Sequence, residues 1–448
     1  MKNVFFVGIN GIGMSGLAKI MNELGYSVAG SDPSVSYLTD EMRKQGITIY
    51  SEHKKENLKD ADTLVVSTAI SKENPEYMEA VKRGIPVLKR GELLAELLNQ
   101  KTGIAVAGTH GKTTTSSMMA TVLMEKDPTI VVGGIVDCIK SNARYGAGEY
   151  FVAEADESDN SFLYMRPKYS VITNIEADHH EKHGCLENIK KSFNIFMQQT
   201  EREIIVCADN KNIQDIIGYK DNVVRYSLID KSADIYAADI KIADGKTKFD
   251  VYIKGEYVGE FSLSIPGTHN VYNSLPVIYL AREFGLDMKT VKEKIESFKG
   301  AKRRYDILFD NGNVKVIDDY AHHPTEIEAT LQGARSIEDK HITVIFQPHR
   351  YSRVKFLLED FAGTFKNADE LILMPIYSAG EKDEFGVSIE DLLKKIDHRN
   401  GKIIKDRDEL ENNLLERQEN HVYLFMGAGN ISSAAHEFAE KLQEKGIN

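Results

Sequence analysis

The chain of 448 residues contains little cysteine and no long apolar run. Its three cysteines, Cys138, Cys185 and Cys207, are scattered and form no CxxC pair, so they predict a reduced compartment rather than a disulfide framework. The apolar run that follows Met1 is shorter than that of a signal peptide, and no later run reaches the roughly 18 apolar residues of a transmembrane helix. We therefore expect a cytoplasmic protein without membrane insertion.

Positive charge is also in deficit. The sequence has 56 Lys and Arg against 68 Asp and Glu, a formal net charge of −12. With no excess of cations to offset phosphates, a nucleic-acid partner is not expected. A composition of 42% hydrophobic and 28% charged residues is that of a globular protein, and the length predicts two or three domains.

One stretch has the pattern of a phosphate-binding loop. An apolar segment of strand character, 103–107, runs into a Gly-rich turn and then into a helix-compatible segment, through Gly108, Thr109, His110, Gly111, Lys112, Thr113 and Thr114. Backbone N–H groups of such a turn converge on an anion at the start of the helix. Lys112 is suited to neutralise phosphate charge and the Thr113 hydroxyl to bind Mg²⁺. Val106 replaces a glycine of the general pattern; ATP or a similar nucleotide is the expected ligand.

A second Gly-rich turn follows the strand expected at 4–7. It contains Gly8, Gly11, Gly13 and Ser15, and Asp32 follows the next strand about 20 residues later, as in a dinucleotide-binding fingerprint. Asn10 takes the position of the middle glycine, where the backbone approaches a pyrophosphate, so the ligand need not be NAD. A diphosphate is the expected ligand, and a plain strand-to-helix turn is the alternative. Ser67 and Thr68 end a further strand, at the edge where open α/β sheets bind ligands.

Polar residues follow two central strands, expected at 150–153 and 169–172. The first is followed by the acidic run 154–159, which begins at Glu154, and the second by 173–180, which contains Asn174 and His179. Carboxylates beside a phosphate loop suit a Mg²⁺–ATP site, whereas the alternative is a solvated acidic loop. His179, His180 and His183 also allow a zinc site, but the sequence has no HExxH motif.

Two further clusters lie nearer the C-terminus. Asn270 and Asn273 are three residues apart and share one face of an expected helix, where the alternative is a cap plus a surface residue. A third α/β unit follows residue 300, with polar runs at 318–324 and 347–353 after its first two strands. Arg350 and Arg353 are spaced to bind a carboxylate, and arginine at a helix start is unfavourable unless an anion is present. The turn 427–430 is either ligand-facing or tightly packed.

Taken in order, these motifs resemble the Mur ligase family. The matching stretches are 8–16, 108–115, 154–159, 174–179, 269–273, 300–304, 318–324 and 347–353. The resemblance implies an α/β fold with three domains: an N-terminal Rossmann-like parallel sheet for a UDP-sugar (1–99), a central P-loop ATPase-type sheet with flanking helices (100–300), and a C-terminal Rossmann-like α/β domain for the amino acid (301–448). It also implies peptidoglycan precursor synthesis, in which ATP activates the lactyl carboxylate of UDP-N-acetylmuramate as an acyl phosphate that L-alanine then attacks.

The resemblance also implies roles for individual residues. The catalytic set would be Lys112, Glu154, Asn174, His179 and His322. Two Mg²⁺ ions would be held by Thr113, Glu154 and His179, and ATP would be bound by 108–114 together with Asn270, Asn273, Arg304 and Asp319. The UDP side would use Gly11, Gly13, Ser15, Asp32, Ser67 and Thr68, and the alanine side His322, Arg350 and Arg353.

Other interpretations remain open. The nearest is a sister ligase that attaches a whole peptide to the same sugar; the run Gly11 to Ser15 favours the alanine-adding type. A non-catalytic nucleotide-binding regulator would lack the set Lys112, Glu154 and His179, and a folate-polyglutamate-type synthetase lacks the N-terminal unit. A nicotinamide dehydrogenase is disfavoured by Asn10 and by the second phosphate site. Two features depart from the family pattern: Asn10 replaces a glycine, and 178–181 reads Asp-His-His-Glu.

Overall fold

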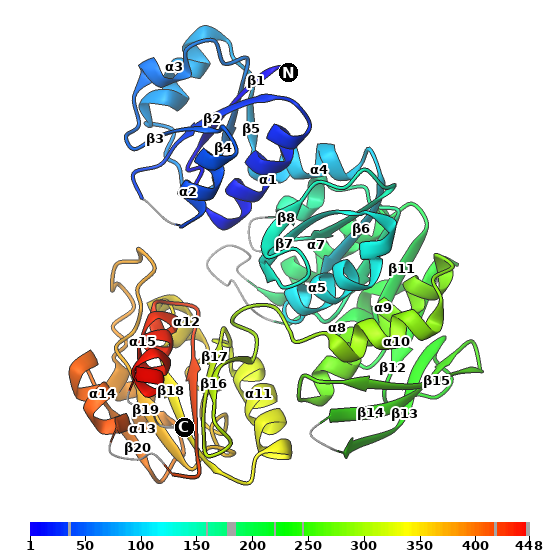
Figure 1. Cartoon of the computed structure of the whole chain (residues 1–448), viewed down its shortest axis with the longest axis vertical. Coiled ribbons are helices and arrows are strands. Elements are labelled where there is room, and N and C mark those ends of the chain that lie inside the picture. Colours follow the sequence, from blue (N-terminus) through cyan, green and yellow to red (C-terminus); the bar gives the residue numbers. More distant parts are fainter. Residues whose placement is uncertain are drawn as a thin grey trace. The chain divides into compact units, whose positions relative to one another are not determined.

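The computed structural model of the chain describes residues 1–34, 37–157, 160–176, 185–218, 221–243, 246–415 and 419–444. It contains three sheets, each flanked by helices (Figure 1). The described residues form two compact units: one takes those within 1–176, 187–236 and 275–291, and the other takes those within 185–186, 237–274 and 292–444. Among the described helices, none has the length and apolarity needed to cross a membrane.

The N-terminal sheet has five parallel strands in the order β3-β2-β1-β4-β5. Its central strand is apolar and buried on both faces, as expected for a parallel sheet covered by helices. The strands are β1 (Asn3–Val7), β2 (Ser27–Ser31), β3 (Thr48–Tyr50), β4 (Thr63–Val66) and β5 (Val87–Lys89), and the helices are α1 (Ile12–Glu23), α2 (Tyr37–Lys44), η1 (Lys55–Leu58), α3 (Pro75–Arg83) and α4 (Arg90–Leu98).

The central sheet is mixed, with the order β15-β14-β13-β12-β11-β10-β6-β9-β7-β8. Strand β6 lies between β10 and β9, and all three are parallel. The strands are β6 (Thr102–Ala107), β7 (Thr129–Val136), β8 (Ser141–Arg144), β9 (Tyr150–Glu154), β10 (Tyr169–Ile172), β11 (Glu203–Cys207), β12 (Val223–Ser227), β13 (Ile235–Ala243), β14 (Lys246–Ile253) and β15 (Glu256–Leu263). The helical segments are α5 (Lys112–Leu123), η2 (Met124–Lys126), η3 (Ser161–Tyr164), α7 (Leu186–Gln198), α8 (Lys211–Ile217), α9 (Thr268–Glu283) and α10 (Met288–Ser297).

The C-terminal sheet has the order β16-β17-β21-β18-β19-β20, and only its edge strand β16 is antiparallel to its neighbour among the described pairs. A buried apolar cluster covers each face of this sheet. The strands are β16 (Asp306–Asp310), β17 (Val314–Asp319), β18 (His341–Phe346), β19 (Glu370–Leu373), β20 (Gly401–Ile403) and β21 (His421–Met426), and the helices are α11 (Pro324–Ile337), α12 (Tyr351–Phe356), α13 (Ile389–Lys395), α14 (Arg407–Leu415) and α15 (Ile431–Glu444).

These three sheets confirm the expected α/β class. The strands expected at 4–7, 103–107, 150–153 and 169–172 are present as β1, β6, β9 and β10, with ends that differ by at most one residue. The strands β13, β14 and β15 were not predicted from the sequence. In β14 the buried and partly buried residues alternate, because one face of this antiparallel segment packs inward.

Candidate functional site

The expected phosphate loop is a strand, a tight turn and a helix. Gly108 and Gly111 have φ of 140° and 83°, values that favour glycine, and α5 begins at the next residue, Lys112. A Cβ on Gly108 would lie 2.0 Å from Thr173 Oγ1, so the turn packs directly against the end of β10. The predicted strand–turn–helix arrangement is therefore confirmed.

Asn174 holds this turn from the side of β10. Its Oδ1 accepts a hydrogen bond from His110 N at 2.8 Å, and its Nδ2 donates to His110 O at 3.0 Å. Thr109 N also donates to Asn174 O at 3.1 Å. At the far side of the turn, His110 Nε2 lies 3.2 Å from a Glu176 carboxylate oxygen. Asn174 thus fixes the shape of the loop, and Glu176 is a neighbour that the sequence did not single out.

Lys112 is held inside the loop by three oxygen atoms. Its Nζ donates to Gly108 O at 2.5 Å, to Thr109 O at 3.1 Å and to Glu157 Oε1 at 2.9 Å. Burial alone would lower the pKa of Lys112, but the charges of the neighbouring carboxylates, Glu157 first among them, outweigh it and raise the pKa. Burial raises the pKa of Glu157 as well. The sequence pointed to the acidic run as a whole, and the structure identifies Glu157 as its member beside the lysine.

Glu154 lies at the other side of the same turn, at the end of β9. Its Oε2 accepts hydrogen bonds from Thr113 Oγ1 and from Gly133 N, both at 2.9 Å. A hydroxyl and a carboxylate at this distance are hard oxygen donors of the kind that Mg²⁺ prefers. The donor set of Thr113 and Glu154 therefore fits the expected metal. The third expected ligand, His179, and its neighbours 177–184 lie outside the described residues.

Asn270 and Asn273 lie on the first turns of α9 and are both buried. Asn273 Nδ2 donates to Asn270 Oδ1 at 3.3 Å, and Asn270 Nδ2 donates to Pro266 O at 2.6 Å. The two residues share a helix face as predicted, and the alternative that one of them is a surface residue is wrong. Burial lowers the pKa of the adjacent His269 to about 4.

Arg304, Asp319 and His322 lie around the end of β17. The Asp319 carboxylate accepts hydrogen bonds from Tyr305 N at 2.7 Å and Ala321 N at 2.8 Å, and burial raises its pKa to about 6. Glu326, the N3 residue of α11, lies 3.6 Å from Arg304 Nη1 and 3.4 Å from His322 Nδ1. Glu326 therefore links the two predicted residues, although the sequence did not single it out.

Arg350 and Arg353 lie at the start of the short helix α12. Arg350 has φ of 71° and ψ of 133°, an uncommon conformation for a residue with a side chain, and its guanidinium lies 3.4 Å from Glu381 Oε1. Arg353 is buried, and its Nη1 lies 3.1 Å from His349 Nδ1. The rings of His349 and His322 have centroids 6.0 Å apart, so the predicted alanine-side residues lie in one neighbourhood.

The turn after β21 is explained by packing. A Cβ on Gly427 would lie 2.6 Å from Gln347 O, and one on Gly429 would lie 2.5 Å from Gln347 Oε1. Arg303 Nη2 donates to both glycine carbonyls, at 2.8 and 3.2 Å. The turn 427–430 is therefore tightly packed, and a ligand-facing role for it stays a prediction.

The N-terminal Gly-rich turn is tied to the end of β2. Gly8 N and Ile9 N donate to Ser31 O at 2.8 and 3.2 Å, and Asn10 N donates to Asp32 Oδ2 at 3.0 Å. The Asn10 side chain is buried; it donates to Ser34 O and accepts from Thr39 Oγ1, so it fastens the segment after β2.

The other residues predicted for the UDP side surround this turn. Ser67 packs against Gly8, with a Cβ on that glycine only 3.2 Å from Ser67 Cβ, and Thr68 follows it. Gly11 is the N-cap residue of α1. Gly13 faces the guanidinium of Arg90, whereas Ser15 is fully buried and its hydroxyl donates to Ile12 O at 3.0 Å.

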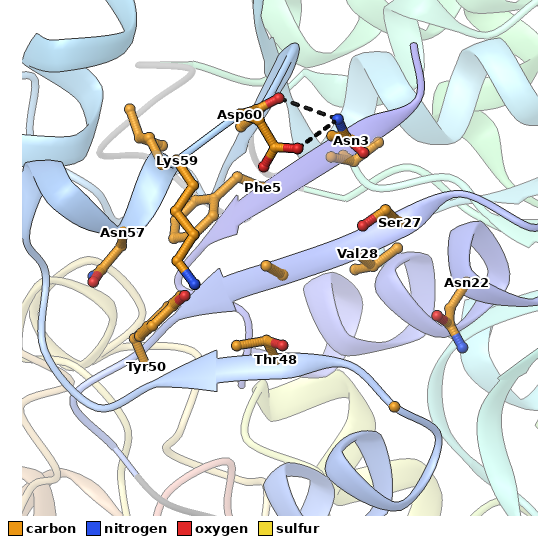
Figure 2. A pocket seen from close by; sticks show the side chains of 15 residues that line it. Asn3, Phe5, Asn22, Ser27, Val28, Thr48, Tyr50, Asn57, Lys59 and Asp60 are labelled. Carbon is orange, nitrogen blue, oxygen red and sulfur yellow. Dashed lines mark hydrogen bonds between the residues drawn. The ribbon is translucent and has the colours of Figure 1, made fainter.

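A groove of about 300 Å³ lies elsewhere on the N-terminal sheet (Figure 2). It is lined by residues of β1, β2 and β3, by the segment 57–61, and by Asn22 and Gly46. Asn3 Nδ2 donates to Asp60 O at 3.2 Å and to Asp60 Oδ2 at 3.3 Å on one side of it (Figure 2). None of the predicted site residues in the described part of the chain lines this groove.

Three family models match successive parts of the chain. They are "Mur ligase family, catalytic domain" over residues 3–102, "Mur ligase middle domain" over residues 106–281 and "Mur ligase, glutamate ligase domain" over residues 303–429. The chain belongs to the Mur ligase family. A UDP-N-acetylmuramate–L-alanine ligase of Fusobacterium nucleatum subsp. nucleatum is 54% identical and covers 99% of this chain and 97% of its own. Another from Carboxydothermus hydrogenoformans is 44% identical, over 98% of this chain and 97% of its own.

Solved structures of the family show the same architecture. A UDP-N-acetylmuramate–alanine ligase from Thermotoga maritima superposes with a TM-score of 0.84 and 33% identity, over 99% of this chain and 100% of that one. A murein peptide ligase from Psychrobacter arcticus superposes with a TM-score of 0.71 and 24% identity, over 99% of each chain, which shows the fold alone.

In the present chain, the ammonium group of Lys190 is paired with two neighbouring carboxylates. It lies 2.9 Å from Asp215 and 3.4 Å from Glu187.

Proposed function

We propose that this chain is an ATP-dependent ligase that joins L-alanine to the lactyl carboxylate of UDP-N-acetylmuramate through an acyl phosphate, in peptidoglycan precursor synthesis. The observation that carries the proposal is the loop in which Lys112 and the Thr113–Glu154 pair converge at the ends of parallel strands. Relatives that carry this activity in their names match the chain over nearly its whole length. ATP and a UDP-sugar are cytoplasmic metabolites, so the reaction is assigned to that compartment.

The central residues have distinct tasks in this proposal. The N-terminus of α5 and the backbone N–H groups of 108–111 bind the phosphates, and Lys112 stabilises the phosphoryl group that is transferred. Asn174 holds the turn in the shape that aims those N–H groups. Thr113 and Glu154 would hold one Mg²⁺, and we assign His179 to a second ion. These cations would neutralise charge on the phosphoryl oxygens.

The remaining predicted residues are assigned to the organic parts of the substrates. Asn270 and Asn273 are proposed to contact adenine, and Arg304 and Asp319 the phosphates and ribose. His322, Arg350 and Arg353 are proposed for the alanine side, where two arginines suit a carboxylate. Gly11, Gly13, Asp32, Ser67 and Thr68 are proposed for the UDP side; Ser15, being buried, would support the start of α1 from within.

The competing activity within the family is attachment of a peptide to the same sugar. Phosphate release with ATP, Mg²⁺ and UDP-N-acetylmuramate, measured with L-alanine, glycine, L-serine and a tripeptide, separates the two. We expect strong stimulation by L-alanine and its loss in Lys112→Met. Stimulation by the tripeptide above that by L-alanine would overturn the specificity, and phosphate release that ignores every acceptor would indicate a regulator or an ATPase instead.

A further inference from the structure

A buried carboxylate in the N-terminal domain has no part in the function proposed so far. Glu76 lies in the first turn of α3, and its side chain is fully buried. Ser31 Oγ lies 2.6 Å and His53 Nδ1 3.0 Å from its Oε2. Its Oε1 accepts hydrogen bonds from Asn57 Nδ2 at 2.7 Å and from Lys54 N at 3.3 Å. One carboxylate thus joins the end of β2, the segment after β3 and η1.

The carboxylate is connected to the Gly-rich turn through Ser31. The hydroxyl of Ser31 donates to Glu76, while the carbonyl oxygen of the same residue accepts hydrogen bonds from Gly8 N and Ile9 N. The next residue, Asp32, accepts a hydrogen bond from Asn10 N. A displacement of Ser31 would therefore move the backbone N–H groups at the start of the turn.

One position of the Glu76 side chain requires an acceptor, because Asn57 Nδ2 and Lys54 N both donate to Oε1. An amide that keeps its oxygen at this position turns its NH₂ group toward Ser31 Oγ, which now donates to Oε2. The serine hydroxyl would then have to accept this hydrogen bond instead of donating it. Glu76→Gln therefore rearranges the buried hydrogen bond that holds Ser31.

We propose that Glu76 is a positioning residue for binding of the UDP part of the substrate: it holds Ser31, and through Ser31 the turn that receives the diphosphate. It does not touch the substrate. This inference rests on the proposed function, because it assigns the first Gly-rich turn to the nucleoside diphosphate.

The test compares Glu76→Gln with a matched control on the same helix. Glu79→Gln makes the same change at a carboxylate that is paired with Arg83 at 2.7 Å and takes no part in the hydrogen bonds described above. For Glu76→Gln we expect the KM for UDP-N-acetylmuramate to rise at least tenfold, with kcat and the KM for ATP within threefold of the parent. For Glu79→Gln we expect all three constants to stay within twofold. A purely structural role would instead lower the amount of active protein and leave the KM for the sugar nucleotide unchanged.

Ser31→Ala provides a second route if Glu76→Gln folds poorly. It removes the hydroxyl that links the two parts and leaves Glu76 its partners Asn57 and Lys54 N. We expect a rise in the same KM, and in the double variant a rise no larger than that of the stronger single variant. Equal changes in the KM values for both substrates, or additive effects, would overturn the inference.

Calorimetric binding of UDP keeps this inference separate from the proposed function. If the parent protein binds UDP and Glu76→Gln binds it equally well, Glu76 does not position the turn, whatever the enzyme does. If the parent shows no turnover of UDP-N-acetylmuramate, the proposed function is wrong, whereas a selective loss of UDP affinity in Glu76→Gln would still support the positioning role.

Discussion

We expect the ion pair between Lys112 and Glu157 to oppose nucleotide binding, because in the proposed function the lysine exchanges a carboxylate for a phosphate. The two charged atoms lie 2.9 Å apart, and both side chains are largely buried. At an effective dielectric constant of about 20, their gross attraction is about 6 kcal/mol. Desolvation of the two ions cancels several kcal/mol of this, so a net coupling of about 1–2 kcal/mol remains. Replacing Glu157 by glutamine keeps an oxygen acceptor for Lys112 and removes the charge.

We therefore expect Glu157→Gln to bind ADP more tightly than the parent when no metal is present. A net term of about 1 kcal/mol corresponds to a roughly fivefold lower Kd. The assay is calorimetric titration with ADP in the presence of a chelator, so that no cation contributes. Glu125→Gln is the matched control. Glu125 is exposed in η2, which directly follows the helix α5 that begins at Lys112, and the substitution makes the same chemical change.

The opposite result would refute this reasoning. If Glu157→Gln binds ADP more weakly than the parent, the carboxylate helps to place Lys112 for the phosphate rather than competing with it. If Glu125→Gln tightens binding by the same factor, the effect comes from the overall charge and not from the ion pair.

Three further outcomes are expected. Thr113→Ala should raise the Mg²⁺ concentration needed for half-maximal activity at least tenfold while Thr113→Ser restores it, since the hydroxyl 2.9 Å from Glu154 is the proposed Mg²⁺ ligand; an unchanged Mg²⁺ titration would remove Thr113 from the metal site. Asn10→Ala should destabilise the N-terminal domain by about 1–3 kcal/mol, because one buried and one partly buried hydrogen bond are lost; urea unfolding measures this, and equal stability would contradict it. Burial lowers the pKa of His269 from its ordinary 6.5 to about 4, so the folded state resists a proton that the unfolded state accepts. The stability that this group contributes is present above pH 6.5 and is lost as the pH falls towards 4, by roughly 2–3 kcal/mol. The free energy of unfolding, measured at pH 7 and at pH 4, should therefore fall less in His269→Gln than in the parent. An equal fall in both proteins would place the acid sensitivity at another group.

Features encoded within a few residues were predictable. The turn at 108–111 could be placed because a buried strand, two glycines with positive φ and a helix start all leave local marks in the sequence. Asn270 and Asn273 were correctly placed on one face because helical spacing alone decides it. The strands β13 to β15 escaped prediction because their burial depends on what packs against each face.

The sequence by itself determined where the strands before the polar clusters lie and where Gly-rich turns follow them, because apolar periodicity and backbone freedom are local properties. Only the tertiary structure decided which of these ends meet. Strand order places β6 between β9 and β10, and this brings Glu154, Glu157 and Asn174 to the same loop from segments more than 40 residues away. In the same way Glu76 reaches Ser31 across 45 residues. Such pairings depend on how strands are arranged in a sheet, and that arrangement is fixed by packing over the whole domain rather than by any single stretch of chain.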